Sequence, residues 1–153
     1  MCGIVGFLNK QNPLDRKSQD LIRRMSAKLS HRGPDDSGIW SDSETGIALG
    51  HQRLAIQDLS PAGKQPMPSK SGRYQIVYNG EIYNAKQLVV ELAQGSECAL
   101  DLVGHSDTEV LLASIEAWGL QTAVSKCIGM FAFALWDKND EVLHLVRDRL
   151  GIK

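Results

Sequence analysis

Runs of apolar residues with the length of strands recur along the chain. They occupy residues 2–8, 46–56, 74–78, 129–136 and 142–146. The run at 129–136 is apolar at both odd and even positions, which predicts a strand covered on both faces. The polar turn at 137–140 predicts that the run after it is the antiparallel partner of this strand.

Between these runs, apolar residues at helical spacing predict helices. The expected helices occupy residues 13–30, 84–95, 106–119 and 120–126. Asn12 and Asn84 are predicted to cap the first two, and the spacing of Ser106 and Glu109 is that of a capping box. Strands at the start, middle and end with helices between them predict an α+β fold, in which sheets pack between helical layers.

Two turn-rich segments interrupt this pattern. Residues 31–38 are too dense in Gly, Pro and Asp for regular structure and predict a loop. Asn79-Gly80, directly after the strand at 74–78, is the commonest hairpin signal and predicts a tight turn. A second interpretation is that the Asn79 amide and the Gly80 N–H both point at a developing oxyanion.

The composition is that of a soluble globular protein, with 153 residues, 42% hydrophobic and 23% charged. A net charge of −1 without long runs of one sign argues against nucleic acid and anionic membranes as partners. No window approaches the ~18 consecutive apolar residues of a membrane span. Cys2, Cys98 and Cys127 are odd in number and lack paired metal-ligand spacing, which predicts reduced thiols, no metal site and a cytoplasmic protein.

Cys2 has a chemical option that no internal cysteine has. If Met1 is removed, which a small second residue permits, the thiol and a free α-amino group share one carbon. That amine has an intrinsic pKa of about 7.7–8.0, so its neutral form can take the thiol proton directly or through one water. Nucleophile and base then come from one residue. The alternative interpretation is that Cys2 is simply a small apolar residue that begins a strand. With Met1 retained, the nitrogen of Cys2 is a peptide amide and cannot serve as the base.

Two charged residues each have a binding and a structural interpretation. Arg53 is either a surface cation or the fork that takes a substrate carboxylate in a bidentate pair. Asp107 is either a favourable acid at a helix N-terminus or a partner for a substrate ammonium group. The glycines at 46 and 50, in the strand before Arg53, predict a backbone that another part of the molecule approaches closely.

Four segments together resemble the glutaminase domain of class II glutamine amidotransferases, a branch of the N-terminal-nucleophile hydrolases. They are residues 2–6 (Cys-Gly-Ile-Val-Gly), 31–38 (His-Arg-Gly-Pro-Asp-Asp-Ser-Gly), 78–84 (Tyr-Asn-Gly-Glu-Ile-Tyr-Asn) and 106–109 (Ser-Asp-Thr-Glu). Within that class the motifs are most similar to those of glutamine-hydrolysing asparagine synthetases.

This resemblance implies a four-layer αββα sandwich with two antiparallel sheets, and hydrolysis of L-glutamine to glutamate and ammonia through a γ-glutamyl thioester. It implies that Cys2 is the nucleophile with its own α-amine as base, and that Asn79 and Gly80 form the oxyanion hole. The substrate-binding residues implied by the resemblance are Arg53, Leu54, Ala55, Ile56, Gln57, Asn79, Gly80, Glu81 and Asp107.

The resemblance also implies a division of the chain. Residues 1–146 would form the glutaminase domain, which needs no metal or cofactor, and residues 147–153 would begin the connection to a C-terminal synthetase domain that uses ATP and Mg²⁺. The expected partners are L-glutamine and that synthetase domain, with a homodimer as an open alternative. The ammonia would serve asparagine synthesis from aspartate.

Three alternatives stay open at this point. The ammonia acceptor could be a sugar or a peptide carboxylate instead of aspartate. The chain could also be a non-catalytic domain of the same fold. A different enzyme class is a cysteine–histidine hydrolase that pairs Cys2 with His51, His105 or His144; it predicts activity that survives blocking of the α-amine.

Overall fold

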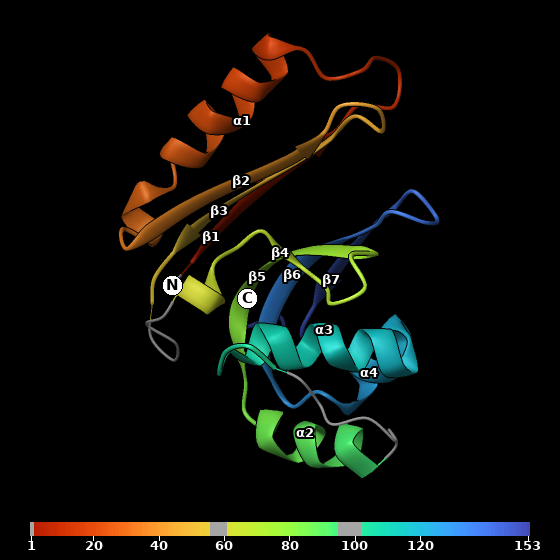
Figure 1. The fold of residues 1–153 in the computed structure, drawn as a ribbon. Coiled ribbons are helices and arrows are strands. Elements are labelled where there is room, and N and C mark those ends of the chain that lie inside the picture. Colours follow the sequence, from red (N-terminus) through yellow and green to blue (C-terminus); the bar gives the residue numbers. More distant parts are fainter. Residues whose placement is uncertain (1, 56–60, 95–101) are drawn as a thin grey trace.

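The computed structural model describes residues 2–55, 61–94 and 102–153 (Figure 1). The strands are β1 (Gly3–Leu8), β2 (Asp36–Asp42), β3 (Ile47–Arg53), β4 (Met67–Pro68), β5 (Tyr74–Ile82), β6 (Gly129–Asp137) and β7 (Val142–Arg147). The α-helices are α1 (Arg16–Ala27), α2 (Ala85–Gln94), α3 (Asp107–Trp118) and α4 (Leu120–Lys126), and short 3-10 turns cover Ser30–Arg32 and Pro61–Gly63.

The strands form two antiparallel sheets that pack between helices. One sheet has the order β1-β3-β2 and the other the order β4-β5-β6-β7. Figure 1 shows α1 covering the outer face of the first sheet, α3 and α4 covering the outer face of the second, and α2 beyond α3. The predicted α+β fold with its helix–sheet–sheet–helix layering is confirmed.

The central strands of the second sheet bury side chains on both faces, as the apolar run at 129–136 predicts. Phe133 and Leu135 of β6 pack toward the helices, together with Ile76 of β5. Ala134 and Trp136 face the other sheet. Successive side chains of a strand point to opposite faces, so this parity places β6 between two apolar layers.

Helix α1 begins later than the sequence pattern suggests. Asn12 does not cap it: Asp15 is the N-cap, and its carboxylate accepts hydrogen bonds from the Ser18 amide and hydroxyl, both at 2.8 Å. Leu14 then lies before the helix and packs in the small core beneath it. Asn and Asp are equally good caps, so local sequence could not choose between positions 12 and 15.

Asn84 precedes α2 as predicted, but its side chain serves another purpose. Its amide donates to the Lys126 carbonyl at 2.9 Å, and its oxygen accepts from the Ile128 amide at 2.8 Å. The side chain therefore joins the end of β5 to the start of β6. The predicted end of this helix at Gly95 lies outside the described residues.

The two turn-rich segments contribute to strands. Residues 31–38 form a loop only in part, because β2 begins at Asp36 and pairs with β3. The Asn79-Gly80 pair does not turn the chain: β5 continues through it, with Gly80 opposite Phe131 of β6. A Cβ at Gly80 would collide with the Met130 carbonyl, so the close approach of two strands, and not a hairpin, requires this glycine.

The prediction that Gly50 permits a close approach is confirmed. A Cβ there would lie 3.0 Å from a Val5 methyl and 3.3 Å from the Ser26 Cβ. Helix α1 therefore packs directly on the backbone of β3.

No helix within the described ranges is long and apolar enough to cross a membrane.

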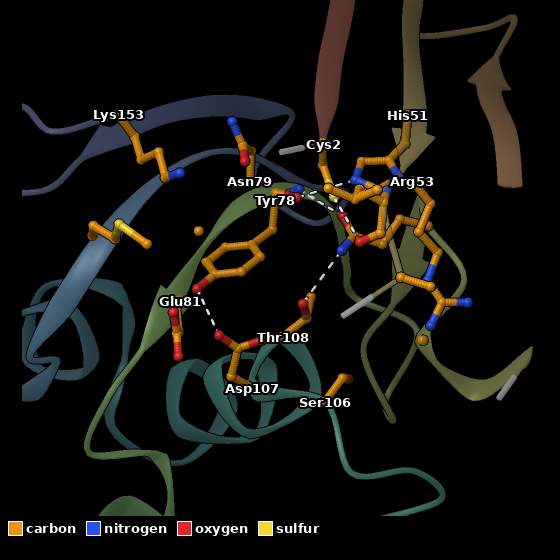
Figure 2. Close-up of a pocket in the computed structure, with 16 residues that line it drawn as sticks. Cys2, His51, Arg53, Tyr78, Asn79, Glu81, Ser106, Asp107, Thr108 and Lys153 are labelled. Carbon is orange, nitrogen blue, oxygen red and sulfur yellow. Dashed lines mark hydrogen bonds between the residues drawn. The ribbon is translucent and has the colours of Figure 1, made fainter. Parts of the chain in front are cut away.

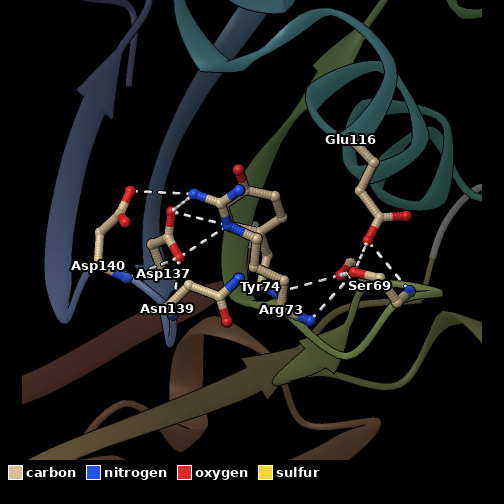
Figure 3. A network of polar contacts seen from close by, with 8 residues as sticks. Ser69, Arg73, Tyr74, Glu116, Asp137, Asn139 and Asp140 are labelled. Carbon is tan, nitrogen blue, oxygen red and sulfur yellow. Dashed lines mark hydrogen bonds and ion pairs between the residues drawn. The ribbon is translucent and has the colours of Figure 1, made fainter.

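A polar network closes the end of the second sheet (Figure 3). The Arg73 guanidinium donates to both carboxylate oxygens of Asp137, with distances of 2.6–3.1 Å, and to Asp140 at 3.0 Å. Asp137 also accepts from the backbone amides of Asn139 and Asp140. These hydrogen bonds, above all those from Arg73, hold the pKa of the Asp137 carboxyl below its usual value.

We expect Asp137→Ala to lower the free energy of unfolding by about 1–3 kcal/mol at pH 7, because Arg73 and the amides of Asn139 and Asp140 lose the buried carboxylate that accepts their hydrogen bonds. A carboxyl whose pKa is lowered by folding contributes stability that is complete above its unfolded pKa of about 3.9 and is lost as the pH falls through the folded value. In urea unfolding, the gap between wild type and variant should therefore shrink below about pH 4.

The matched control is Asp140→Ala, whose side chain is 65% exposed. It should change the free energy of unfolding by no more than about 0.5 kcal/mol. If the difference in the free energy of unfolding between wild type and Asp137→Ala were as large at pH 2 as at pH 7, the lowered pKa of Asp137 would be contradicted.

Candidate active site

A cavity of about 130 Å³ opens where the two sheets meet the N-terminus of α3 (Figure 2). All the described residues that the sequence predicts for catalysis or substrate binding line it: Cys2, Arg53, Leu54, Ala55, Asn79, Gly80, Glu81 and Asp107. Ile56 and Gln57 lie outside the described residues. Three of the four segments that carry the resemblance thus contribute to the lining, and residues 31–38 do not.

Cys2 reaches the cavity from the start of β1. Gly3 pairs with Gln52 of β3, which places Cys2 beside the segment that follows β3. The Leu54 amide donates to the Cys2 sulfur at 3.4 Å, and the sulfur lies 3.7 Å from the Leu54 carbonyl oxygen. Cys2 is half-buried and is a free thiol. The thiol is therefore anchored by backbone and still borders the cavity.

Cys127 has the opposite environment. It is fully buried, its thiol donates to the Ala123 carbonyl at 3.2 Å, and burial raises its pKa to about 11. A thiol with so high a pKa is protonated at neutral pH and inert as a nucleophile. Cys98 lies outside the described residues.

Strand β5 supplies three consecutive groups to the cavity. Its residues 74–78 are buried, whereas Asn79, Gly80 and Glu81 are partly exposed. The change occurs where the strand passes the cavity, beyond the end of the short edge strand β4. Part of β5 therefore presents its side chains and backbone to the cavity.

Arg53 ends β3 and is buried, so its interpretation as a surface cation is wrong. Its guanidinium lies against Gly63, where an added Cβ would collide with it. The loop before β2 holds the same region: the Asp35 amide donates to the Arg53 carbonyl at 3.0 Å, and the Asp35 carboxylate accepts from the Ala55 amide at 2.8 Å. A buried guanidinium beside a cavity suits recognition of a carboxylate.

Asp107 is the first residue of α3, but its carboxylate is directed at β5. The Tyr78 hydroxyl and the Ile82 amide both donate to Oδ2 at 2.8 Å. Ser106 caps the helix by accepting from the Glu109 amide, as the predicted spacing requires. Burial raises the pKa of Asp107, and these hydrogen bonds oppose the rise. The Asp107 carboxylate therefore links α3 to β5, which a helix-capping acid would not do.

The histidines differ in their position. Within the described lining, His51 is the one that borders the cavity, and His105 and His144 do not. The His51 Nε2 donates to the Tyr78 carbonyl at 3.1 Å, and burial lowers its pKa to about 4. A histidine with that pKa is neutral and only weakly basic at pH 7.

Several lining residues are not indicated as part of a site by the sequence pattern: Gly63, Gln65, Tyr78, Ser106, Thr108, Met130 and Lys153. Tyr78, Ser106 and Thr108 occur inside the motifs, but nothing marks their side chains as part of a cavity. Lys153 lies beside the cavity because the Asp148 carboxylate fixes the backbone of this segment. It accepts hydrogen bonds from the amides of Phe131, Leu150, Ile152 and Lys153. Such long-range contacts leave no local pattern.

No three His, Cys, Asp or Glu side chains of the described chain gather as a metal site would require. The charged side chains of the cavity are two cations, Arg53 on β3 and Lys153 after β7, and two carboxylates, Glu81 on β5 and Asp107 on α3. This arrangement suits a small zwitterion, with separate partners for its carboxylate and its ammonium group.

Comparison with known proteins gives a consistent result. The family model of the glutamine amidotransferase domain matches residues 1–153. Asparagine synthetases (glutamine-hydrolysing) 3 and 1 of Bacillus subtilis are 42% and 44% identical over 156 residues, covering all of this chain and 24% and 23% of those proteins. Amidase chry2 of Gibberella zeae is 37% identical over 161 residues, again over the whole chain and 23% of its own length.

Among solved structures, glutamine phosphoribosylpyrophosphate amidotransferase from B. subtilis, complexed with ADP and GMP, superposes with a TM-score of 0.72 at 22% identity. The match covers 98% of this chain and 38% of that one. The chain therefore has the same fold, and it spans about a quarter of the length of the curated relatives.

Proposed function

Because the chain belongs to the class II glutamine amidotransferase family, we propose that it hydrolyses L-glutamine to glutamate and ammonia with Cys2 as the nucleophile. The observation that carries this proposal is the position of Cys2. Its thiol borders a cavity that Arg53, Asn79 and Asp107 also line. The proposed nucleophile, the partner of the substrate carboxylate, the oxyanion donor and the partner of the ammonium group thus come from four different parts of the fold.

The proposed chemistry proceeds in two steps. The Cys2 thiolate attacks the side-chain amide carbon of glutamine, a C–S bond forms, and the C–N bond breaks with release of ammonia. Water then adds to the γ-glutamyl thioester, the C–S bond breaks, and glutamate leaves with the thiol restored. Dividing one difficult hydrolysis into two easier steps is the general advantage of a covalent nucleophile.

The α-amine of Cys2, freed by removal of Met1, is the proposed base. It takes the thiol proton and returns one to the leaving nitrogen. The alternative base, His51, fits less well: burial lowers its pKa to about 4, which leaves little basicity at neutral pH. This difference favours the N-terminal-nucleophile mechanism over a cysteine–histidine pair.

In each step the attacked carbonyl oxygen becomes an oxyanion. Asn79 and Gly80 supply a side-chain amide and a backbone N–H beside the cavity, and donors fixed before the reaction stabilise such a charge strongly. Arg53 is the proposed partner of the substrate carboxylate, and Glu81 and Asp107 of its ammonium group. Leu54, Ala55, Ile56 and Gln57 complete the proposed binding segment.

We further propose that residues 1–146 are the glutaminase domain and that 147–153 begin a connection to a synthetase domain. The much greater length of the asparagine synthetase relatives supports this division. In that arrangement the second domain uses ATP and Mg²⁺ to transfer the ammonia to aspartate. The amidase relative supports the alternative of another acceptor, such as a sugar or peptide carboxylate. A homodimer and a cytoplasmic location stay predictions.

The proposal is tested by mass mapping of the N-terminal peptide after the folded protein reacts with a diazoketone analogue of glutamine. We expect one adduct, on Cys2 in chains that lack Met1, and protection by excess L-glutamine. Cys127 should stay unmodified because it is buried. Absence of the Cys2 adduct in a folded chain without Met1 would overturn the proposal.

A further inference from the structure

Tyr78 of β5 lies where three elements of the site meet. Figure 2 shows its ring extending from β5 toward Asp107. Its hydroxyl donates to Asp107 at 2.8 Å, its amide donates to the Gln65 side chain at 2.6 Å, and its carbonyl accepts from His51 at 3.1 Å. All four side chains line the cavity. One residue thus connects β3, the segment before β4, and α3.

The backbone contacts of Tyr78 replace a missing strand partner. The register of β4 and β5 pairs Met67 with Ile76, so its extension would place Gln65 opposite Tyr78. The strand β4 begins only at Met67. The Gln65 side chain, which also donates to the Thr108 hydroxyl at 3.3 Å, accepts from the Tyr78 amide instead. Buried backbone groups need such partners, so this part of β5 is held firmly.

The hydroxyl contact has a different consequence. Tyr78 is only 3% exposed, so water does not compete for its hydroxyl. Together with the Ile82 amide it directs two donors at one carboxylate oxygen, Oδ2 of Asp107. Two donors from one strand fix the rotation of the carboxylate and stabilise its charged form.

We propose that Tyr78 is a positioning residue that holds the Asp107 carboxylate for the α-ammonium group of the substrate, while its anchored backbone places Asn79 and Gly80. This inference rests on the proposed function. The two tasks use different atoms of Tyr78, so substitution can separate them. Removing the hydroxyl affects the ammonium contact, whereas the Gln65 and His51 contacts to the backbone stay.

The test is Tyr78→Phe in the full chain with Met1 removed. We expect the KM for L-glutamine to rise about tenfold, the size of a lost hydrogen bond to a charged group, with kcat within about twofold of wild type. Binding of L-glutamine to the same variant in a Cys2→Ala background, measured by calorimetry, should weaken by the same factor. The matched control is Tyr83→Phe, at a side chain that is 60% exposed, and it should change neither constant.

A desamino analogue, glutaramate, distinguishes positioning from general damage to the pocket. It lacks the ammonium group that Asp107 is proposed to bind, so its inhibition constant should be the same for wild type and Tyr78→Phe. Equal weakening of glutamine and glutaramate, or an unchanged KM for glutamine, would overturn the inference. Hydrolysis that persists in Cys2→Ala would instead overturn the proposed function, so the two failures are distinguishable.

Discussion

Cys2→Ala is expected to lower the rate of glutamine hydrolysis by roughly 10⁴-fold or more, because removal of a covalent nucleophile leaves only binding and oxyanion stabilisation. The measurement is glutamate release from the purified chain, with its N-terminal residue verified by mass. Cys127→Ala is the matched control, since that thiol is buried and bonded to the Ala123 carbonyl. It should retain the wild-type rate.

The same activity measurement distinguishes the N-terminal-nucleophile mechanism from a cysteine–histidine pair when the α-amine is blocked and the thiol is left intact. An N-terminal extension that turns the Cys2 nitrogen into a peptide amide should abolish hydrolysis as completely as Cys2→Ala. Activity that survives the extension would show that another base, such as His51, serves the thiol. Both variants should keep the wild-type melting temperature, because Cys2 lies outside the clusters of buried apolar residues.

Asn79→Ala should lower kcat by about 10²–10³-fold, the usual effect of removing one oxyanion donor. The KM for glutamine should change little, because the donor acts on the charge that develops in the transition state. Steady-state kinetics of the variant gives both constants. A large rise in KM at unchanged kcat would show instead that Asn79 binds the ground state of the substrate.

Asn139→Ala is the matched control for that experiment. Asn139 is exposed in the turn between β6 and β7, and it contacts Asp137 through its backbone amide, which alanine retains. We expect wild-type kinetics from this variant. Comparing the two variants shows whether the loss of activity comes from the position of Asn79 beside the cavity or from exchanging any asparagine for alanine.

Strands with strong apolar patterns could be predicted from the sequence because their burial is visible within a few residues. β6 and its partner β7 are examples. The Asn79-Gly80 pair shows where local inference fails. Its turn preference is a local property of two residues. The pairing of β5 with β6 runs through the same two residues and extends from Tyr74 to Ile82. Tertiary pairing therefore overrides the local turn signal.

The site divides in the same way. Cys2, Asn79 and Asp107 occur in recognisable motifs, and Arg53 is a charged residue at the end of an apolar run, so the sequence indicated all four as candidates. Gln65 could not be predicted, because its importance arises from a partner, Tyr78, that lies thirteen positions further along the chain. The residues that hold a site together are defined by contacts across the fold, whereas the residues that react are defined by their own chemistry.

The cavity lining extends from Cys2 to Lys153, and this sets the order in which the site assembles during synthesis. Cys2 leaves the ribosome first, Asn79 and Asp107 follow, and Lys153 comes last. Contacts between such distant residues form late, because the chain must close long loops before they are made. A nascent chain therefore displays the proposed nucleophile well before it has the proposed oxyanion hole. We expect glutamine hydrolysis only after the distant segments of the cavity have come together.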